Sequence, residues 1–458
     1  MITGSTSLSA LIRQVAASPR AMQEAVVPAQ SFSASHSSAV SSASPLSQQS
    51  GFAGVQRKVE DDGYVGSGLQ LSLTLSSGRD IDLSIEKGVT GQVKHIQLDT
   101  GGELSSDDEA KLKTFLMSLS DSVDAIFSGS ANSNLFDFTN QPGISDVEIH
   151  AQQDQGNQKQ KLSFESSVNR YGRKDVSGEW LKYDRLTGES EQHHFALSKQ
   201  PRDVMMSYGQ MDYQWVVDQV AAGMGVLGNA YTGDQSLQSN VTDVFVSAVH
   251  ALFDETKRGH GLLQSLGASA HDAKAFLGRT IRAFSNDNSK ENAIAAQNIN
   301  RNKAANMNGL ADFKADFSSK REGTFGVNSS GDYNLAMSVS QISHAVPGQS
   351  EDDASQIQTR RLILDFESQG RKHSFDYQWR HDEMLIHNYN QGQLEKTYFK
   401  LMYAKLSTLT QGNQQRQESH EYMQRQEYKA NQSTPSLQNG YVKPKTYSEQ
   451  KSNVHYTV

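Results

Sequence analysis

The chain has 458 residues, of which 36% are hydrophobic, and its formal net charge is -8 at pH 7. The 43 Lys and Arg residues are spread along the chain, which excludes the basic patch expected of a protein that binds nucleic acid or an anionic membrane surface. The absence of cysteine excludes disulfides, thiolate metal sites and thiol nucleophiles.

The sequence carries no signal for a membrane span. No apolar run approaches the ~18 residues that a spanning helix needs. Arg13 and Gln14 interrupt the first apolar stretch, where a cleaved secretion signal would be uninterrupted. The compartment stays open between the cytoplasm and export by a route without a cleaved signal.

Residues 1–58 are rich in serine and poor in aromatic side chains, so they bury too little apolar area to offset the entropy lost on ordering. We predict a disordered N-terminal segment. Within it, a short amphipathic helix would place Leu8, Leu11, Ile12 and Val15 on one face.

Residues 59–200 are predicted to form a β-rich region with one capped helix. Apolar residues alternate with polar ones over 69–75 and again over 81–85, which indicates a half-buried hairpin. Ser105 precedes acidic residues in a capping-box arrangement, and apolar residues at helical spacing follow as far as Gly129. Alternation returns over 162–197 between glycine turns and predicts a β-meander.

Residues 201–320 are predicted to be helical. Three segments have apolar residues at helical spacing: "YQWVVDQVAAGMGVL", "NVTDVFVSAVHALFDETKRG", which would stop at Gly259, and "SAHDAKAFLGRTIRAF". The Asn-rich residues 286–310 would form a connector or a weakly packed helix.

Residues 321–410 are predicted to be a second β-region that ends in a helix over "QLEKTYFKLMYAKLSTL". Residues 411–458 are Gln-rich and are predicted to be a disordered tail. The order of strands, helices and strands predicts an α+β fold, in which β-hairpin and meander regions flank a central helical layer and both tails are disordered.

Two short segments share the pattern L-x-F-E-S, at 162–166 and at 364–368. Each is followed by an aromatic strand, which contains Trp180 and Tyr183 in one case and Tyr377 and Trp379 in the other. The match indicates either a duplicated β-unit or a chance similarity between strands. These aromatic side chains would either form an exposed recognition face, together with Tyr171, Tyr389, Tyr398 and Phe399, or lie in the core.

Gly223, Gly225 and Gly228 have the spacing G-x-G-x-x-G of a dinucleotide-binding loop. That motif needs a preceding strand, a helix that begins at the last glycine, and an acidic residue at a strand end. Here the residues before Gly223 have helical spacing, the residues after Gly228 are polar, and Asp243 falls inside the next predicted helix. We therefore predict that the glycines let a helix pack closely and then end it, without a bound dinucleotide.

The histidines suggest no metal site. His193 and His194 are adjacent, so in a strand they point to opposite faces, and His250, His260 and His271 lack the spacing of H-E-x-x-H. The segment "WRHDEM" places His381 beside Asp382 and Glu383. These three residues would serve as acid and base if a pocket enclosed them, or would form a solvated hairpin loop.

One segment carries a resemblance. "GELSSDDEAKLKTFLMSLSDSVDAIFSGS", residues 102–130, resembles the E-L-S/T-x-x-E helix ending in F-x-G of uncharacterised bacterial proteins of unknown function, whose N-termini are also Ser-rich and Cys-poor. The resemblance implies a bacterial source and brings no activity, cofactor or site residue with it.

The polar tails, the β-rich flanks and the lack of a convergent catalytic motif favour a non-catalytic interaction or accessory protein with a protein partner, without cofactor or metal. The alternative is a hydrolase-like enzyme whose site is not visible in the sequence, for which His381, Asp382 and Glu383 are the candidates.

Overall fold

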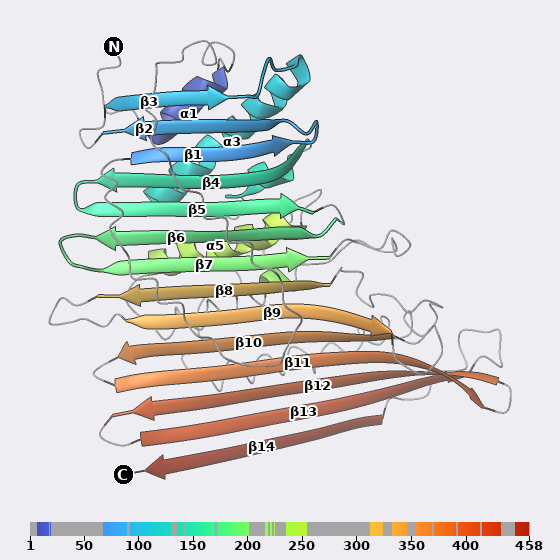
Figure 1. The fold of residues 1–458 in the computed structure, drawn as a ribbon. Helices are drawn as coiled ribbons and strands as arrows, with labels where there is room; N and C mark the ends of the chain where they lie inside the picture. The colour runs from blue at the N-terminus through green and yellow to red at the C-terminus, as the bar shows by residue number, and fades with distance from the viewer. Residues whose placement is uncertain are drawn as a thin grey trace.

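Fourteen antiparallel strands form one continuous sheet in the computed structural model (Figure 1). The structure describes residues 7–17, 19, 67–88, 92–129, 135–141, 143–169, 172–200, 216–218, 220–221, 224, 235–253, 312–323, 332–345, 354–368, 371–390, 393–412, 415–431 and 445–457. The strands are β1 (Ser67–Leu75), β2 (Asp80–Lys87), β3 (Val93–Asp99), β4 (Ile144–Gln155), β5 (Gln158–Val168), β6 (Lys174–Asp184), β7 (Ser190–Lys199), β8 (Phe313–Glu322), β9 (Tyr333–Ala345), β10 (Ala354–Ser368), β11 (Arg371–Asn390), β12 (Gln393–Gln411), β13 (Gln415–Asn431) and β14 (Lys445–Thr457).

The sheet is a meander with one departure. From β5 to β14 every strand pairs with the strand before it, whereas β4 pairs with β1, which lies between β2 and β4. Strand β7 pairs directly with β8 although residues 200–312 separate them in the chain. The predicted α+β fold is therefore wrong. The segment between β7 and β8, whose described part includes a helix over residues 235–253, is an insertion on one sheet that runs without a break through both predicted β-regions.

The registers give the sheet two unlike faces, because directly opposed residues of antiparallel strands point the same way. One row of opposed residues crosses β3 to β12, and apart from Gly178 its side chains are at most 4% exposed. We call it the central row: Leu98, Leu83, Leu71, Ile149, Phe164, Gly178, Phe195, Phe317, Met337, Leu362, Tyr377 and Leu406. The face that bears it is the inner face.

The opposite face, the outer face, is polar. The row next to the central row is polar except for Ala196, and it runs from β2 to β14 through Asp82, Ser72, Glu148, Glu165, Ser177, Ala196, Asp316, Ser338, Arg361, Gln378, Lys405, Glu421 and Lys451. This alternation is the period-2 pattern of a sheet with one face packed and one face solvated.

The described helices lie on one side of the sheet (Figure 1). They are α1 (Leu8–Ala17), α3 (Ser106–Ser128), the short 3-10 helix η1 (Asp137–Asn140) and α5 (Gln235–Phe253). Phe136, which precedes η1, stacks on Phe164 with ring centroids 4.6 Å apart, and Phe245 of α5 lies 5.0 Å from Phe317. These contacts place the helices on the inner face, over the part of the sheet that extends to β8.

Helix α3 begins and ends as its sequence predicts. The Ser105 side chain accepts a hydrogen bond from the Asp108 amide, and Gly129 ends the helix with φ of 70°, which glycine adopts without steric cost. Helix α1 packs against α3, and the four apolar residues predicted on its face are all buried. The helix at the N-terminus is thus confirmed, while residues 1–6, 18 and 20–58 lie outside the described part of the chain.

The hairpin over β1 and β2, the meander over β5 to β7 and the helix that includes residues 241–253 are confirmed. The predicted helix over residues 269–284, the connector over 286–310 and the stop at Gly259 lie outside the described residues. Two C-terminal predictions are wrong. Residues 393–409 belong to strand β12, and the predicted disordered tail contributes β13 and β14.

The two L-x-F-E-S segments lie in β5 and β10, with Leu162, Phe164, Leu364 and Phe366 on the inner face. Five steps of an antiparallel order separate β5 from β10, so the two strands run in opposite directions. Both β5 and β10 have their successor on the same side in the strand order. A rigid copy of such a pair that reversed direction could keep that order only by turning over, which would exchange its two faces, yet both segments keep their apolar residues on the inner face. The topology therefore favours chance similarity over a duplicated unit.

Gly178 leaves no room for a side chain on the inner face. A Cβ there would lie 2.9 and 3.0 Å from Cε1 and Cε2 of Phe195, and closer still to Cζ. We expect Gly178→Ala to destabilise the fold by about 1–3 kcal/mol through overpacking, measured by chemical denaturation. Ser177→Ala, on the outer face of the same strand, is the control and should change stability by less than about 0.5 kcal/mol. Adding Phe195→Leu should recover part of the loss, and equal destabilisation by both alanine variants would contradict the packing argument.

Candidate functional site

The candidates His381, Asp382 and Glu383 lie inside β11 and not in a hairpin loop. Strand alternation sends His381 and Glu383 to the inner face, where His381 Nε2 lies 3.4 Å from Glu383 Oε1. Asp382 points to the outer face and pairs with Arg380 at 2.7 Å. The structure brings together two of the three residues, and the side chains of those two are only 10% and 16% exposed. The loop interpretation is therefore wrong.

The rejected dinucleotide loop falls outside the described residues, since Gly223, Gly225 and Gly228 are not among them. Nearby residues that are described, Val216, Val220 and Met224, are helical and buried, as the helical spacing predicts. Asp243 lies within α5, and burial raises the pKa of its carboxyl to about 6.

The remaining histidine and aromatic candidates divide between the faces. His193 is buried on the inner face and His194 is exposed on the outer face, so their predicted divergence is confirmed. Trp180, Tyr377 and Trp379 are buried and belong to the core. His250 lies in α5. His260, His271 and Tyr171 lie outside the described residues, as do the side chains of Tyr389, Tyr398 and Phe399.

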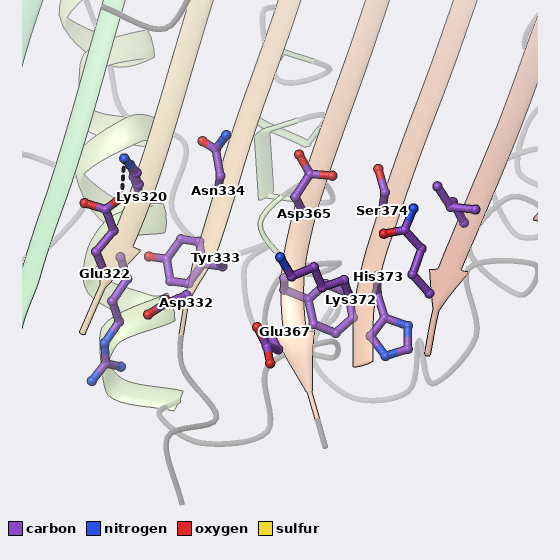
Figure 2. A pocket seen from close by; sticks show the side chains of 14 residues that line it. Lys320, Glu322, Asp332, Tyr333, Asn334, Asp365, Glu367, Lys372, His373 and Ser374 are labelled. Atoms are coloured by element: carbon purple, nitrogen blue, oxygen red, sulfur yellow. Dashed lines mark ion pairs between the residues drawn. The ribbon is translucent and has the colours of Figure 1, made fainter. Parts of the chain in front are cut away.

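A depression of about 460 Å³ lies at the end of the sheet where β8, β10 and β12 finish and where β9 and β11 begin (Figure 2). We call it the end hollow. It is lined by Lys320, Arg321, Glu322, Asp332, Tyr333, Asn334, Asp365, Phe366, Glu367, Lys372, His373, Ser374, Leu409 and Gln411.

One row of opposed residues on the outer face forms the wall of the end hollow. It takes one residue from each of the five strands: Lys320, Asn334, Asp365, Ser374 and Leu409. The first four follow one another across the strands in Figure 2. A second, shorter row nearer the strand ends opposes Glu367 to Lys372 and Lys372 to Gln411. We call the five-residue row the hollow row.

Charges of both signs line the end hollow and are paired where the structure describes their contacts. Lys320 Nζ lies 2.5 Å from Glu322 Oε1 on the same strand. Arg321 lies 3.4 Å from Glu189, which precedes β7, and 3.7 Å from Glu191 within β7. With three Lys and Arg residues against four Asp and Glu residues, the lining is close to neutral.

The inner-face side of the hollow contains stacked rings. Phe366 stacks on His373 with centroids 4.8 Å apart, and Thr410 Oγ1 lies 3.3 Å from His373 Nδ1. Burial, and then the charge of Arg371, lower the pKa of His373. The imidazole is therefore neutral at pH 7.

Tyr333 connects the end hollow to a buried polar chain that spans three strands. Its hydroxyl lies 2.9 Å from Ser319 Oγ, which lies 2.9 Å from His193 Nδ1. Trp180 packs against His193 at 5.0 Å between ring centroids. Burial, with a smaller effect of Lys182, lowers the pKa of His193 to about 3, so the imidazole is neutral above that pH. We call Tyr333, Ser319 and His193 the buried chain.

A serine beside a neutral imidazole is the pair that nucleophilic catalysis uses. Here Ser319 is 0% and His193 1% exposed, so no substrate reaches them in this conformation. In the end hollow itself, Ser374 and His373 are neighbours in β11 and point to opposite faces. Within the described residues, the end hollow therefore offers polar groups able to contact a ligand, and it contains no nucleophile in contact with a base.

The described part of the chain contains no cluster of three or more His, Asp or Glu side chains placed to hold a metal ion. None of its helices has the length and hydropathy required to cross a membrane. Comparison with protein-family models, with curated proteins and with solved structures finds no match to this chain.

Sequence reasoning missed the hollow row because its members come from five strands and share no motif. Four of the five residues occupy polar positions of alternating strands, which is all that the local sequence indicates, and Leu409 lies in a segment that was predicted to be a helix. Only the pairing register places Asn334 between Lys320 and Asp365. The short connection between β10 and β11 would have given part of the answer, since the pairing of Ser368 with Arg371 fixes Asp365 opposite Ser374.

The buried chain makes stability depend on pH. Because the pKa of His193 falls from 6.5 to about 3 on folding, the unfolded state binds the extra proton between these values, and stability decreases as the pH falls through that window. We expect His193→Gln to remove up to about 1.4 kcal/mol per pH unit from the slope of unfolding free energy between pH 6 and 3.5, measured by urea denaturation. The exposed neighbour provides the control, since His194→Gln should keep the wild-type slope. Identical slopes for wild type and His193→Gln would refute the assignment.

Proposed function

We propose that the chain is a non-catalytic binding protein that holds an extended segment of a protein partner in the end hollow. The observation that carries the proposal is the hollow row, in which one side chain from each of five successive strands lines a single wall. The strands are tied by continuous ladders, so the row is a preorganised surface that pays little ordering cost on binding.

The dimensions of the hollow row suit a peptide. Strands lie about 4.8 Å apart, so the four intervals between Lys320 and Leu409 span about 19 Å. An extended segment of roughly six residues covers that length. A cation, an amide, a carboxylate, a hydroxyl and an apolar side chain follow in order along the wall, which suits a segment with both charges and hydrogen-bonding groups.

The charge balance of the lining favours a protein over a polyanion. Lys320 is paired with Glu322, Arg321 with Glu189 and Glu191, and Lys372 lies opposite Glu367. Phosphate backbones are bound by arrays of cations without matching acids. A near-neutral hollow on a chain of net charge -8 is a poor surface for such ligands.

A photocrosslinking residue tests the location of the partner. At Asn334, in the hollow row, we expect it to form a discrete adduct with another protein in cells that naturally make this chain. At Ser340, on the same face of the same strand about 20 Å away, we expect no adduct. Adducts of equal yield at both positions, or none at Asn334, would contradict the proposal.

Charge reversal provides a matched pair of variants. Lys314 and Lys320 both lie on the outer face of β8, and each pairs with an acidic residue two positions further on, at 2.6 and 2.5 Å. We expect Lys320→Glu to reduce the Asn334 adduct about tenfold, as the loss of a charged contact within an interface does, and Lys314→Glu to leave it unchanged. The yield of the crosslinked band measures both. A reduction by Lys314→Glu alone would move the interface away from the end hollow.

A further inference from the structure

Strand β14 presents the longer of the two open edges of the sheet. Within the described strands it pairs with β13 alone, over 13 residues, whereas the other edge strand, β3, has seven. An edge strand carries a row of backbone N–H and C=O groups that a further strand can pair with. Residues 445–457 contain no proline that would block such pairing.

A ladder of alternating charge on the outer face runs into this edge. Lys405 of β12 lies directly opposite Glu421 of β13, with Nζ and Oε1 2.9 Å apart, and Glu421 lies opposite Lys451 of β14. Lys405, and then Lys451, lower the pKa of Glu421, as expected of a carboxylate held between two cations. The charges along the ladder are therefore positive, negative and positive, and the last of them, Lys451, lies on the edge strand.

A second charge on β14 completes the pattern. Glu449 lies two residues before Lys451 on the same face, with Oε1 2.7 Å from Lys451 Nζ, and the two side chains are 52% and 65% exposed. If two copies of β14 pair antiparallel about Gln450, Glu449 of each copy falls opposite Lys451 of the other. The charge ladder then continues across the junction in both directions.

The two neighbouring registers of a β14 pair do not place Glu449 opposite Lys451. Pairing centred on Lys451 would oppose lysine to lysine, and pairing centred on Glu449 would oppose glutamate to glutamate. Like charges directly opposite one another destabilise a strand pair. Lysine in an edge strand usually prevents pairing, and here only the register about Gln450 turns that lysine into an attractive contact.

We propose that two copies of the chain associate edge to edge through antiparallel pairing of β14 about Gln450, with Glu449 and Lys451 forming reciprocal ion pairs across a two-fold axis. The axis stands normal to the sheet, so both helix-bearing faces lie on the same side. The partner strand would also cover Val454, an apolar inner-face side chain that is 45% exposed at this edge. A two-fold contact of this kind closes and does not propagate into fibres.

The test is sedimentation of the full chain between about 1 and 100 µM, where a homodimer of moderate affinity is resolved from monomer. We expect reversible dimers for the wild type. Lys451→Glu and Glu449→Lys should each weaken self-association about tenfold or more, since each replaces two attractive pairs by two repulsive ones. Lys314→Glu, a paired lysine on β8 far from the edge, should have no effect.

Mixing the two weakened variants decides the register. In a heterodimer of Lys451→Glu with Glu449→Lys, both opposed pairs again join opposite charges, so the equimolar mixture should regain dimers that neither variant forms alone. This readout also separates interface effects from misfolding, because a misfolded variant would not be rescued by the other. A monomeric wild type, open-ended oligomers, dimers insensitive to either variant, or a mixture that stays monomeric would each overturn the proposal.

Discussion

The structure depends on one constraint: the two-residue alternation of the strands stays in register from β3 to β12. Each large apolar member of the central row contributes about 1.5–3 kcal/mol when buried, and a slip of one residue in any strand would expose that member and bury its outer-face neighbour, which is polar in most strands. The penalty applies on both sides of every internal strand, so the register of each strand is fixed by its two neighbours. A sheet of this width can therefore remain regular, although no local signal sets the position of any single strand.

The end hollow follows from the same constraint. In each of its five strands the hollow-row residue stands three positions from the central row, as Lys320 does from Phe317 and Ser374 does from Tyr377. An odd offset places the side chain on the opposite face, and three residues carry it about 10 Å toward the strand end. The apolar core thus positions the polar wall on the far side of the sheet. The positions of the hollow-row side chains are therefore set by the packing of the central row on the opposite face.

The inner face changes character toward β14. After Leu406 the continuation of the central row is His420 and then Ser452. Strands β10 to β13 also bury ionisable groups, which contact other ionisable side chains or aromatic rings. Arg360 lies 4.6 Å from the ring of Tyr377, His381 lies beside Glu383, and Glu418 pairs with Arg416. Buried polar groups are tolerated when they find partners, and they sharpen register because a slip would separate them.

This gradient explains where sequence reasoning succeeded and failed. Over 69–85 and 162–197 strict alternation permits only strands, and at α3 the Ser105 cap and Gly129 delimit a helix, so these elements were predictable. The segment that forms β12 fits both periods: Leu401, Met402 and Leu406 suit a helix, whereas Met402, Ala404 and Leu406 alternate. Pairing with β11 selects the strand. Strand β13 has few apolar residues, and its pairing with β12 and the ion pair between Glu421 and Lys405 hold it in the sheet. Neither cause is visible in a window of residues.

The two faces also differ in what they make accessible, and this difference weighs against chemistry at the buried chain. Ser319 and His193 lie on adjacent strands and point to the inner face, against which α5 packs, so exposing them requires moving the packed side chains of that face. Such an opening gives up buried apolar area, which makes the open state rare, and a rate that depends on it falls in proportion. The end hollow needs no such motion, because nine of its fourteen residues stand on the outer face at the ends of strands that the core already holds in place. In this conformation the buried chain is closed to solvent, whereas the wall of the end hollow is open to it.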